Sequence, residues 1–143
     1  PIFSQFKKLD LFIKNRNINK ELIVNELKKS YKWNSQFRFI NSPAENLASW
    51  MLLPIILDIK YKNKKKKFID YLENQAIETR PIISGSFNNQ PASKLYNLFK
   101  KNDYYKNAQE IEDLGFIIGL HTKRISYNKL RFLTKHLLMI DKM

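Results

Sequence analysis

The sequence predicts an α+β fold, in which a long N-terminal helix and several shorter helices pack on a small sheet. Apolar residues recur at helical spacing over residues 2–30, and two apolar runs, at 51–57 and 115–120, have the length of strands. Helical patterns lie between and after these runs, which favours a two-layer arrangement. We expect residues 1–143 to form a single domain, because 143 residues are enough for one buried core.

The first predicted element is a long helix over residues 2–30. Its apolar residues recur at spacings of four, three and four, which places them on one helical face. These residues are Ile2, Phe6, Leu9 and Ile13. Because an apolar helical face is normally covered, we expect this one to pack against a second copy of the chain or against a larger domain.

Two strands are predicted after this helix. Phe37 and Phe39 alternate with polar residues and predict a short strand, and the apolar run at 51–57 predicts another. Pro54 lies inside the second run. Because proline cannot donate a backbone hydrogen bond, we expect residues 51–57 to form an edge strand or to contain a bulge.

The next segment predicts a helix and a third strand. Four lysines at 64–67 precede an apolar helical pattern. We expect them to form the solvated first turn of a helix that ends near Asn74, rather than an anion site. Residues 77–80 are expected to form a short strand in the same sheet as residues 115–120.

The second half of the chain alternates loop and helix. Residues 81–91 are rich in Pro, Ser and Asn and predict a loop, and residues 92–100 and 107–114 predict two helices. Gly115 is expected to end the second of these helices in a left-handed conformation. Ser126 is expected to cap a last helix.

The composition excludes several classes of site. The chain has no cysteine, which excludes disulfides, a cysteine-type zinc site and a thiol nucleophile. It has only two histidines, so we expect no metal. The chain also contains no apolar run of about 18 residues and does not open with a signal-peptide pattern. We therefore expect a cytoplasmic protein that does not span a membrane.

The chain is strongly basic. Its formal net charge of +13 and its sequence pI of about 9.9 favour binding of polyanions. However, 21 of its 26 basic residues are lysine, and arginine is the residue that best suits bidentate contacts with phosphates and bases. We therefore do not expect nucleic acid as the partner, and a basic nucleic-acid-binding module remains an alternative function.

The segment after Ile77 contains the candidate binding residues. Glu78 and Arg80 lie two residues apart, which places them on the same face of a short strand. A loop of small hydrogen-bonding residues follows. This composition suits a polyhydroxylated or phosphorylated small molecule. The alternative is an ion pair that ties the strand to an ordinary surface loop.

Other polar residues have weaker patterns. His121 directly follows the last predicted strand, where either a site residue or a turn histidine fits, and His136 is expected to be structural. Glu110, Glu112 and Asp113 share one predicted helix. We expect them to keep that helix soluble rather than to act as paired catalytic carboxylates. No catalytic residue is assigned.

Several segments together resemble one known family. The run IETRPIISGSF, the pair QP at 90–91, the polar residues 107–113 and the run GFIIGLH at 115–121 resemble the C-terminal small domain of the DegT/DnrJ/EryC1/StrS family. The opening segment QFKKLDLFIKNR resembles the family's interdomain helix, here within residues 1–30. The resemblance is nearest to the sugar-nucleotide 3-dehydrase branch.

The resemblance implies a fold and a function. Members of this family are fold-type-I pyridoxal-phosphate enzymes, either aminotransferases or 3-dehydrases, which act on nucleotide sugars in the biosynthesis of deoxy- and amino-sugars for surface polysaccharides. Their large N-terminal domain holds the cofactor and the catalytic Lys or His, and its motifs are absent here. We therefore expect pyridoxal phosphate in the full-length protein and none bound to this chain alone.

The resemblance also implies the residues that line the substrate side of the cleft. The expected substrate-binding residues are Glu78, Arg80, Ser84, Gly85, Ser86, Phe87, Asn88 and His121. The expected partners are a nucleotide sugar, together with the missing large domain or a second copy of the chain. The alternative is a non-catalytic remnant that associates with itself through the helix at 2–30.

Overall fold

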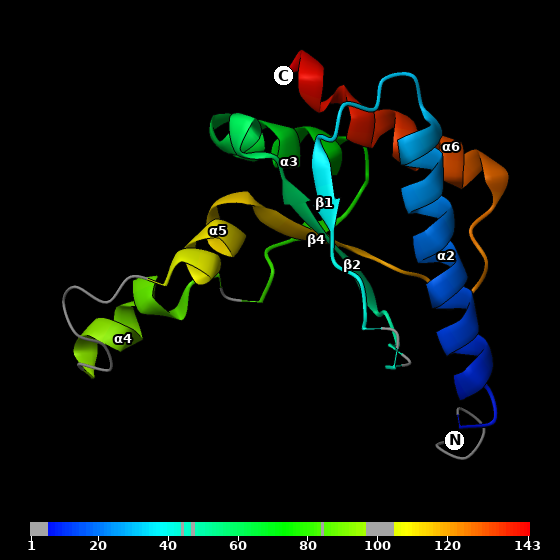
Figure 1. Cartoon of the computed structure of the whole chain (residues 1–143), viewed down its shortest axis with the longest axis horizontal. Coiled ribbons are helices and arrows are strands. Elements are labelled where there is room, and N and C mark those ends of the chain that lie inside the picture. The colour runs from blue at the N-terminus through cyan, green and yellow to red at the C-terminus, as the bar shows by residue number, and fades with distance from the viewer. Residues whose placement is uncertain (1–5, 44, 47, 84, 97–104) are drawn as a thin grey trace.

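The computed structural model contains five helices and one four-stranded sheet among its described residues (Figure 1). It describes the chain except residues 1–5, 44, 47, 84 and 97–104. The helices are α2 (Leu9–Lys29), α3 (Lys65–Asn74), α4 (Pro91–Leu95), α5 (Lys106–Leu114) and α6 (Tyr127–Leu137). The strands are β1 (Phe37–Phe39), β2 (Leu52–Leu57), β3 (Thr79–Arg80) and β4 (Gly115–Gly119). The predicted α+β fold is confirmed.

The strands form an antiparallel sheet in the order β1-β2-β4-β3. The two strands at the centre, β2 and β4, are the predicted apolar runs, and their register pairs Ile55 with Phe116. The short strand β3 pairs with β4, as expected for residues 77–80 and 115–120, although its ladder covers only Thr79 and Arg80. In the view of Figure 1, α2 and α6 lie together on one side and α4 and α5 extend on the other.

One face of the sheet, which we term the core face, packs against helices. Its buried side chains are Leu53, Ile55, Phe116 and Ile118. Phe68 of α3 contacts this face, with its ring centroid 6.0 Å from that of Phe116 in an edge-to-face arrangement. Side chains of α2 and α6 complete the same cluster, with Leu27 and Leu137 fully buried. Burial of this apolar surface is the main source of the fold's stability.

The opposite face, which we term the open face, is only partly covered. Helix α5 contacts β2 and β4 at one end of it, where Ile56 is buried. At the other end, Gly119 is exposed. The residues of the open face are those between the core-face residues, since neighbouring residues of a strand point to opposite faces.

Pro54 lies in a central strand, so the expectation of an edge strand or a bulge was wrong. The alternation of hydrogen bonds in the ladder directs its nitrogen toward β1 rather than β4. There the β1 ladder has already ended, with Phe39 opposite Ile55. The ammonium group of Lys20 donates to the carbonyl oxygen of Ile40, the next residue in register, at 2.6 Å. This bond replaces the backbone donor that proline lacks.

Gly115 does not adopt the left-handed conformation that we expected. Its φ of −87° and ψ of 143° are extended, because α5 passes directly into β4. The position requires glycine for space instead. A Cβ atom there would lie 2.5 Å from the carbonyl oxygen of Ile111 and 2.6 Å from Cδ1 of Ile82.

The remaining helix boundaries largely agree with the sequence. Helix α3 ends at Asn74, and the Ser126 hydroxyl accepts a hydrogen bond from the Lys129 amide at the start of α6. Of the helix predicted at 92–100, residues 97–100 lie outside the described residues, as do residues 1–5 of the N-terminal helix. No helix in the described part of the chain is both long and apolar enough to cross a membrane.

Candidate functional site

Glu78 and Arg80 form an exposed ion pair at the strand β3, which Arg80 ends and Glu78 directly precedes. The Nε and Nη2 atoms of Arg80 both donate to Oε1 of Glu78, at 2.9 and 2.6 Å. The side chain of Arg80 is 71% exposed and that of Glu78 is 75% exposed. An ion pair this exposed contributes little to stability. The guanidinium group therefore stays accessible to a ligand.

The ion pair borders an unfilled stretch of the open face. Arg80 lies opposite Ile117 in the ladder, and the same register continues to place Glu78 opposite Gly119. A Cβ atom built at Gly119 would meet no heavy atom within 4 Å. The backbone of β4 is therefore accessible beside the two charged side chains.

The predicted loop contains two left-handed residues. Gly85 has a φ of +71°, and Ile83 has a φ of +53°, which is strained for a β-branched side chain. Ser86 is buried and Phe87 is half exposed. Ser84, also predicted to bind substrate, lies outside the described residues.

His121 lies at the far end of β4 and does not contact the ion pair. Its Nδ1 accepts a hydrogen bond from the Lys123 amide at 2.9 Å, and its carbonyl oxygen accepts one from Asn19 at 3.0 Å. Four residues separate it from Ile117, which is about 13 Å along an extended strand. Among the residues that the structure describes, no hydrogen bond or ion pair joins His121 to Arg80.

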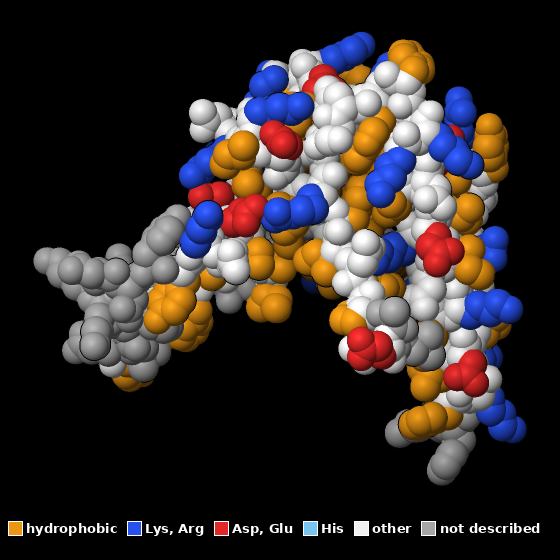
Figure 2. Space-filling view, viewed as in Figure 1, with side chains coloured by type: hydrophobic (Ala, Val, Ile, Leu, Met, Phe, Trp, Pro, Cys, Tyr) orange, Lys and Arg blue, Asp and Glu red, His pale blue; other side chains and the backbone are white. Residues whose placement is uncertain are grey.

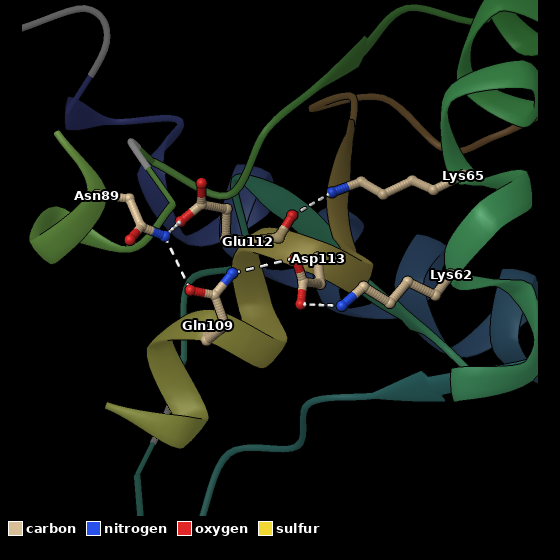
Figure 3. Close-up of polar contacts among 6 residues, drawn as sticks. All are labelled: Lys62, Lys65, Asn89, Gln109, Glu112 and Asp113. Atoms are coloured by element: carbon tan, nitrogen blue, oxygen red, sulfur yellow. Dashed lines mark hydrogen bonds and ion pairs between the residues drawn. The ribbon is translucent and has the colours of Figure 1, made fainter. Parts of the chain in front are cut away.

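The sequence did not indicate how the three carboxylates of α5 are used. We expected them to serve solubility, but each makes a specific contact with another element. Glu110 pairs with Arg38 at 2.7 Å, and Asp113 pairs with Lys62 at 2.7 Å. The hydrogen bond from Lys62 holds the pKa of Asp113 below its usual value. Oε2 of Glu112 accepts hydrogen bonds from the Ser86 amide, in the 85–88 loop, and from the side chain of Asn89. Figure 3 shows the bond from Asn89.

A larger groove lies away from the Glu78–Arg80 pair. A groove of about 1120 Å³ runs over β1, and Val24 of α2 and Gln109 of α5 are among the residues that line it. It contains about as many acidic as basic residues, and several of them pair with one another, as in the Arg38–Glu110 contact. This groove therefore has no distinct chemistry that would select a ligand.

Neither of the two lysines with lowered pKa values, Lys20 and Lys65, fits the imine-forming role of a pyridoxal-phosphate site. That cofactor needs a free lysine or histidine, an anchored phosphate and a carboxylate at its ring nitrogen. Burial lowers the pKa values of Lys20 and Lys65, but each ammonium group donates to a backbone carbonyl, of Ile40 and Glu112 respectively. The described part of the chain also contains no cluster of acidic residues and histidines that could hold a metal ion.

Basic side chains are dispersed rather than gathered. On the face shown in Figure 2, lysine and arginine side chains are spread over several elements and alternate with acidic and apolar ones. Binding of nucleic acid depends on a basic surface that follows the phosphate backbone. This face therefore offers no support for the alternative nucleic-acid-binding function.

Comparison with solved structures identifies similar folds. The chain is similar to Escherichia coli GDP-4-keto-6-deoxy-D-mannose-3-dehydratase with bound hydrated PLP, at 23% identity and a TM-score of 0.78, over 94% of this chain and 33% of that one. A structure of GDP-4-keto-6-deoxymannose-3-dehydratase with bound GDP-perosamine matches at 24% identity and a TM-score of 0.77, over 94% and 33%. Helicobacter pylori PseC, an aminotransferase involved in the biosynthesis of pseudoaminic acid, matches at 17% identity and a TM-score of 0.78, over 98% and 35%.

The chain spans about a third of the length of these solved proteins. No curated protein matches it. The sequence profile of the DegT/DnrJ/EryC1/StrS aminotransferase family matches residues 2–125, which is most of the chain. The chain therefore belongs to the DegT/DnrJ/EryC1/StrS aminotransferase family.

Proposed function

We propose that this chain is the C-terminal small domain of a pyridoxal-phosphate-dependent nucleotide-sugar aminotransferase or 3-dehydrase, and that it supplies the substrate-side wall of the cleft. Family membership over residues 2–125 supports the enzyme class. The 3-dehydrase branch is the nearer one by its sequence motifs, and the product is a deoxy- or amino-sugar for a surface polysaccharide. The cofactor and the catalytic Lys or His belong to a large domain that this chain does not contain, and the assembled enzyme is a cytoplasmic homodimer.

The observation that most supports this role is the exposed guanidinium of Arg80 beside the unfilled surface at Gly119. Arginine presents a planar set of donors that matches the oxygen atoms of a phosphate. Glu78 occupies the Nε and Nη2 edge, and no described residue accepts a hydrogen bond from Nη1. We assign Nη1 to a diphosphate oxygen and Glu78 to a sugar hydroxyl.

We define the ligand wall as Glu78, Arg80 and the loop at 85–88, with His121 at its far end. The loop offers the half-exposed ring of Phe87 and a backbone that, at Gly85, has no side chain to keep a ligand away. His121 contributes a hydrogen-bonding ring and not a catalytic base. Because only one side of the cleft is present, the chain alone binds its ligand weakly.

The proposal is tested by nuclear magnetic resonance on the isotopically labelled 143-residue chain. GDP-mannose is the probe, and mannose alone is the control for the sugar. We expect GDP-mannose to shift the backbone resonances of Gly119, Arg80 and the 85–88 loop together. Shifts confined to the helix α2, or to the groove over β1, would contradict the proposed function.

A second measurement addresses the alternative of a self-associating remnant. Phe6, which precedes α2, and Leu9, its first residue, belong to the predicted apolar face and are 68% and 44% exposed. If this surface were the main functional feature, light scattering would show an oligomer that dissociates on Leu9→Lys substitution, and GDP-mannose would leave the ligand wall unaffected.

A further inference from the structure

One carboxylate, that of Glu112, binds the loop of the ligand wall to the helix α5. The backbone amide of Ser86 donates to Oε2 of Glu112 at 2.8 Å. The side-chain amide of Asn89 donates to the same oxygen at 2.8 Å. Figure 3 shows the Asn89 contact on α5. A single carboxylate oxygen therefore accepts hydrogen bonds both from Ser86, within the loop, and from Asn89, which directly follows it.

Glu112 is itself held in place. The ammonium group of Lys65 donates to its carbonyl oxygen at 2.6 Å. Gly85 packs directly on its side chain, since a Cβ atom at Gly85 would lie 3.0 Å from Cγ of Glu112. Any larger residue at position 85 would displace the carboxylate, in addition to the strain from its positive φ.

The anchor extends to a third element through a chain of hydrogen bonds. Asn89 also donates to Oε1 of Gln109 at 2.8 Å, and Gln109 donates to Asp113 at 3.1 Å. Asp113 pairs with Lys62 at 2.7 Å. The loop, α5 and the turn before α3 are therefore joined in one network, and Figure 3 draws its contacts from Asn89 to Lys62.

Apolar packing alone does not hold this loop. A cavity of about 240 Å³ lies beside its base, and Ile82, Gly85 and Ile111 are among the residues that line it. Ile83, on the segment that leads into the loop, has a strained left-handed backbone that a freely moving segment would relax. The polar contacts to Glu112 therefore contribute to fixing the conformation.

We propose that Glu112 is a positioning residue for the ligand wall: its carboxylate holds the loop at 85–88 in the conformation that faces the ligand beside Arg80. The carboxylate of Glu112 is directed at the loop, where it binds Ser86 and Asn89, and does not contact the ligand. The proposal rests on the proposed function for its ligand, but its statement about the loop can be tested without one.

The first test measures the loop in the absence of ligand. Hydrogen exchange of the Ser86 amide is compared in the wild-type chain, in Glu112→Ala and in Glu112→Gln. We expect Glu112→Ala to speed exchange about tenfold or more, because a charge-assisted hydrogen bond is lost. Glu112→Gln retains an oxygen acceptor and restores most of the protection. Glu110→Ala on the same helix is the matched control and leaves the Ser86 amide unchanged.

A second variant covers the case in which Glu112→Ala does not fold. Gly85→Ala places a Cβ atom against Cγ of Glu112, so we expect it to speed exchange of the Ser86 amide as well. An unchanged exchange rate of the Ser86 amide in Glu112→Ala, or in Gly85→Ala where Glu112→Ala does not fold, overturns the proposal.

The second test adds GDP-mannose. We expect Glu112→Ala to weaken its binding several-fold, and Glu112→Gln and Glu110→Ala to bind as the wild-type chain does. If Glu112→Ala exposes the Ser86 amide but leaves binding unchanged, the positioning role is wrong. If the wild-type chain does not bind GDP-mannose at the ligand wall, the proposed function fails, while the exchange experiment still decides whether Glu112 fixes the loop.

Discussion

The two faces of the sheet are built from the same strands but have different roles. On the core face, Phe116 and Ile118 are 1% and 3% exposed and contact the helices. On the open face, Gly119 is exposed, and Glu78 and Arg80 project beside it. Because alternate residues of one strand belong to different faces, a residue that stabilises the fold is next to one that is free for binding. Substitutions on the two faces should therefore separate stability from binding.

The largest expected effect is on the core face. Phe116→Ala removes a ring that contacts Phe68 and leaves a cavity in a fully packed layer, so we expect a loss of about 3–5 kcal/mol in the free energy of unfolding. Urea unfolding followed by circular dichroism measures it. Gly119→Ala is the control on the same strand and should change the value by about 0.5 kcal/mol or less. Equal losses in both variants would contradict the division between the faces.

A smaller effect is expected at Gly115, where α5 joins β4. Gly115→Ala places a Cβ atom against the carbonyl of Ile111 and the side chain of Ile82, which should cost about 1–3 kcal/mol. Gly115→Asn distinguishes this cause from the left-handed conformation that the sequence suggested. Asparagine tolerates a left-handed backbone, so tolerance of Asn with rejection of Ala would show that conformation, and not space, selects glycine.

The pH dependence of stability should be governed in part by the helical layer over the core face. His136 of α6 is buried, and its Nδ1 lies 2.6 Å from the Tyr71 hydroxyl. Burial, assisted by Lys135, lowers the pKa of His136 below its usual value. His136 therefore binds a proton more readily in the unfolded chain than in the folded one. The contribution of the neutral His136 to the free energy of unfolding is fully present above about pH 6.5, and it is lost as the pH falls below that value.

The urea midpoint at about pH 7.5 and about pH 5.5 checks this expectation, because one proton changes the free energy of unfolding by at most about 1.4 kcal/mol per pH unit. His136→Gln should remove the part of the pH dependence that lies in this range. A midpoint that rises on acidification, or a dependence that His136→Gln leaves intact, would show that the histidine is not held neutral by burial.

Much of the fold could be predicted because its causes are local. The apolar runs at 51–57 and 115–120 and the N-cap at Ser126 are properties of neighbouring residues, and each gave the expected element. Pro54 was misjudged because its tolerance depends on where β1 ends, a fact about a different strand. Gly115 was misjudged because α5 passes directly into the extended backbone of β4, and its space is limited by Ile82, far away in the sequence, as well as by the nearby carbonyl of Ile111.

The site could be predicted only in part. The Glu78–Arg80 pair follows from strand alternation within three residues, and the structure brings these two side chains into contact. The role of Glu112 could not be predicted, because it contacts Ser86 across 26 residues of sequence, and a carboxylate on a polar helix has no local pattern that indicates such a partner. That His121 joins the same site remains a prediction.

The measurement that tests the account most directly is a paired one on Arg80→Ala. The side chain is 71% exposed, so its loss should change the free energy of unfolding by less than about 1 kcal/mol, the smallest effect among these substitutions. The same substitution should abolish the shift of the Gly119 amide on addition of GDP-mannose. If Arg80→Ala binds GDP-mannose as the wild-type chain does, or if it destabilises the chain as much as Phe116→Ala, the open face is not the binding surface.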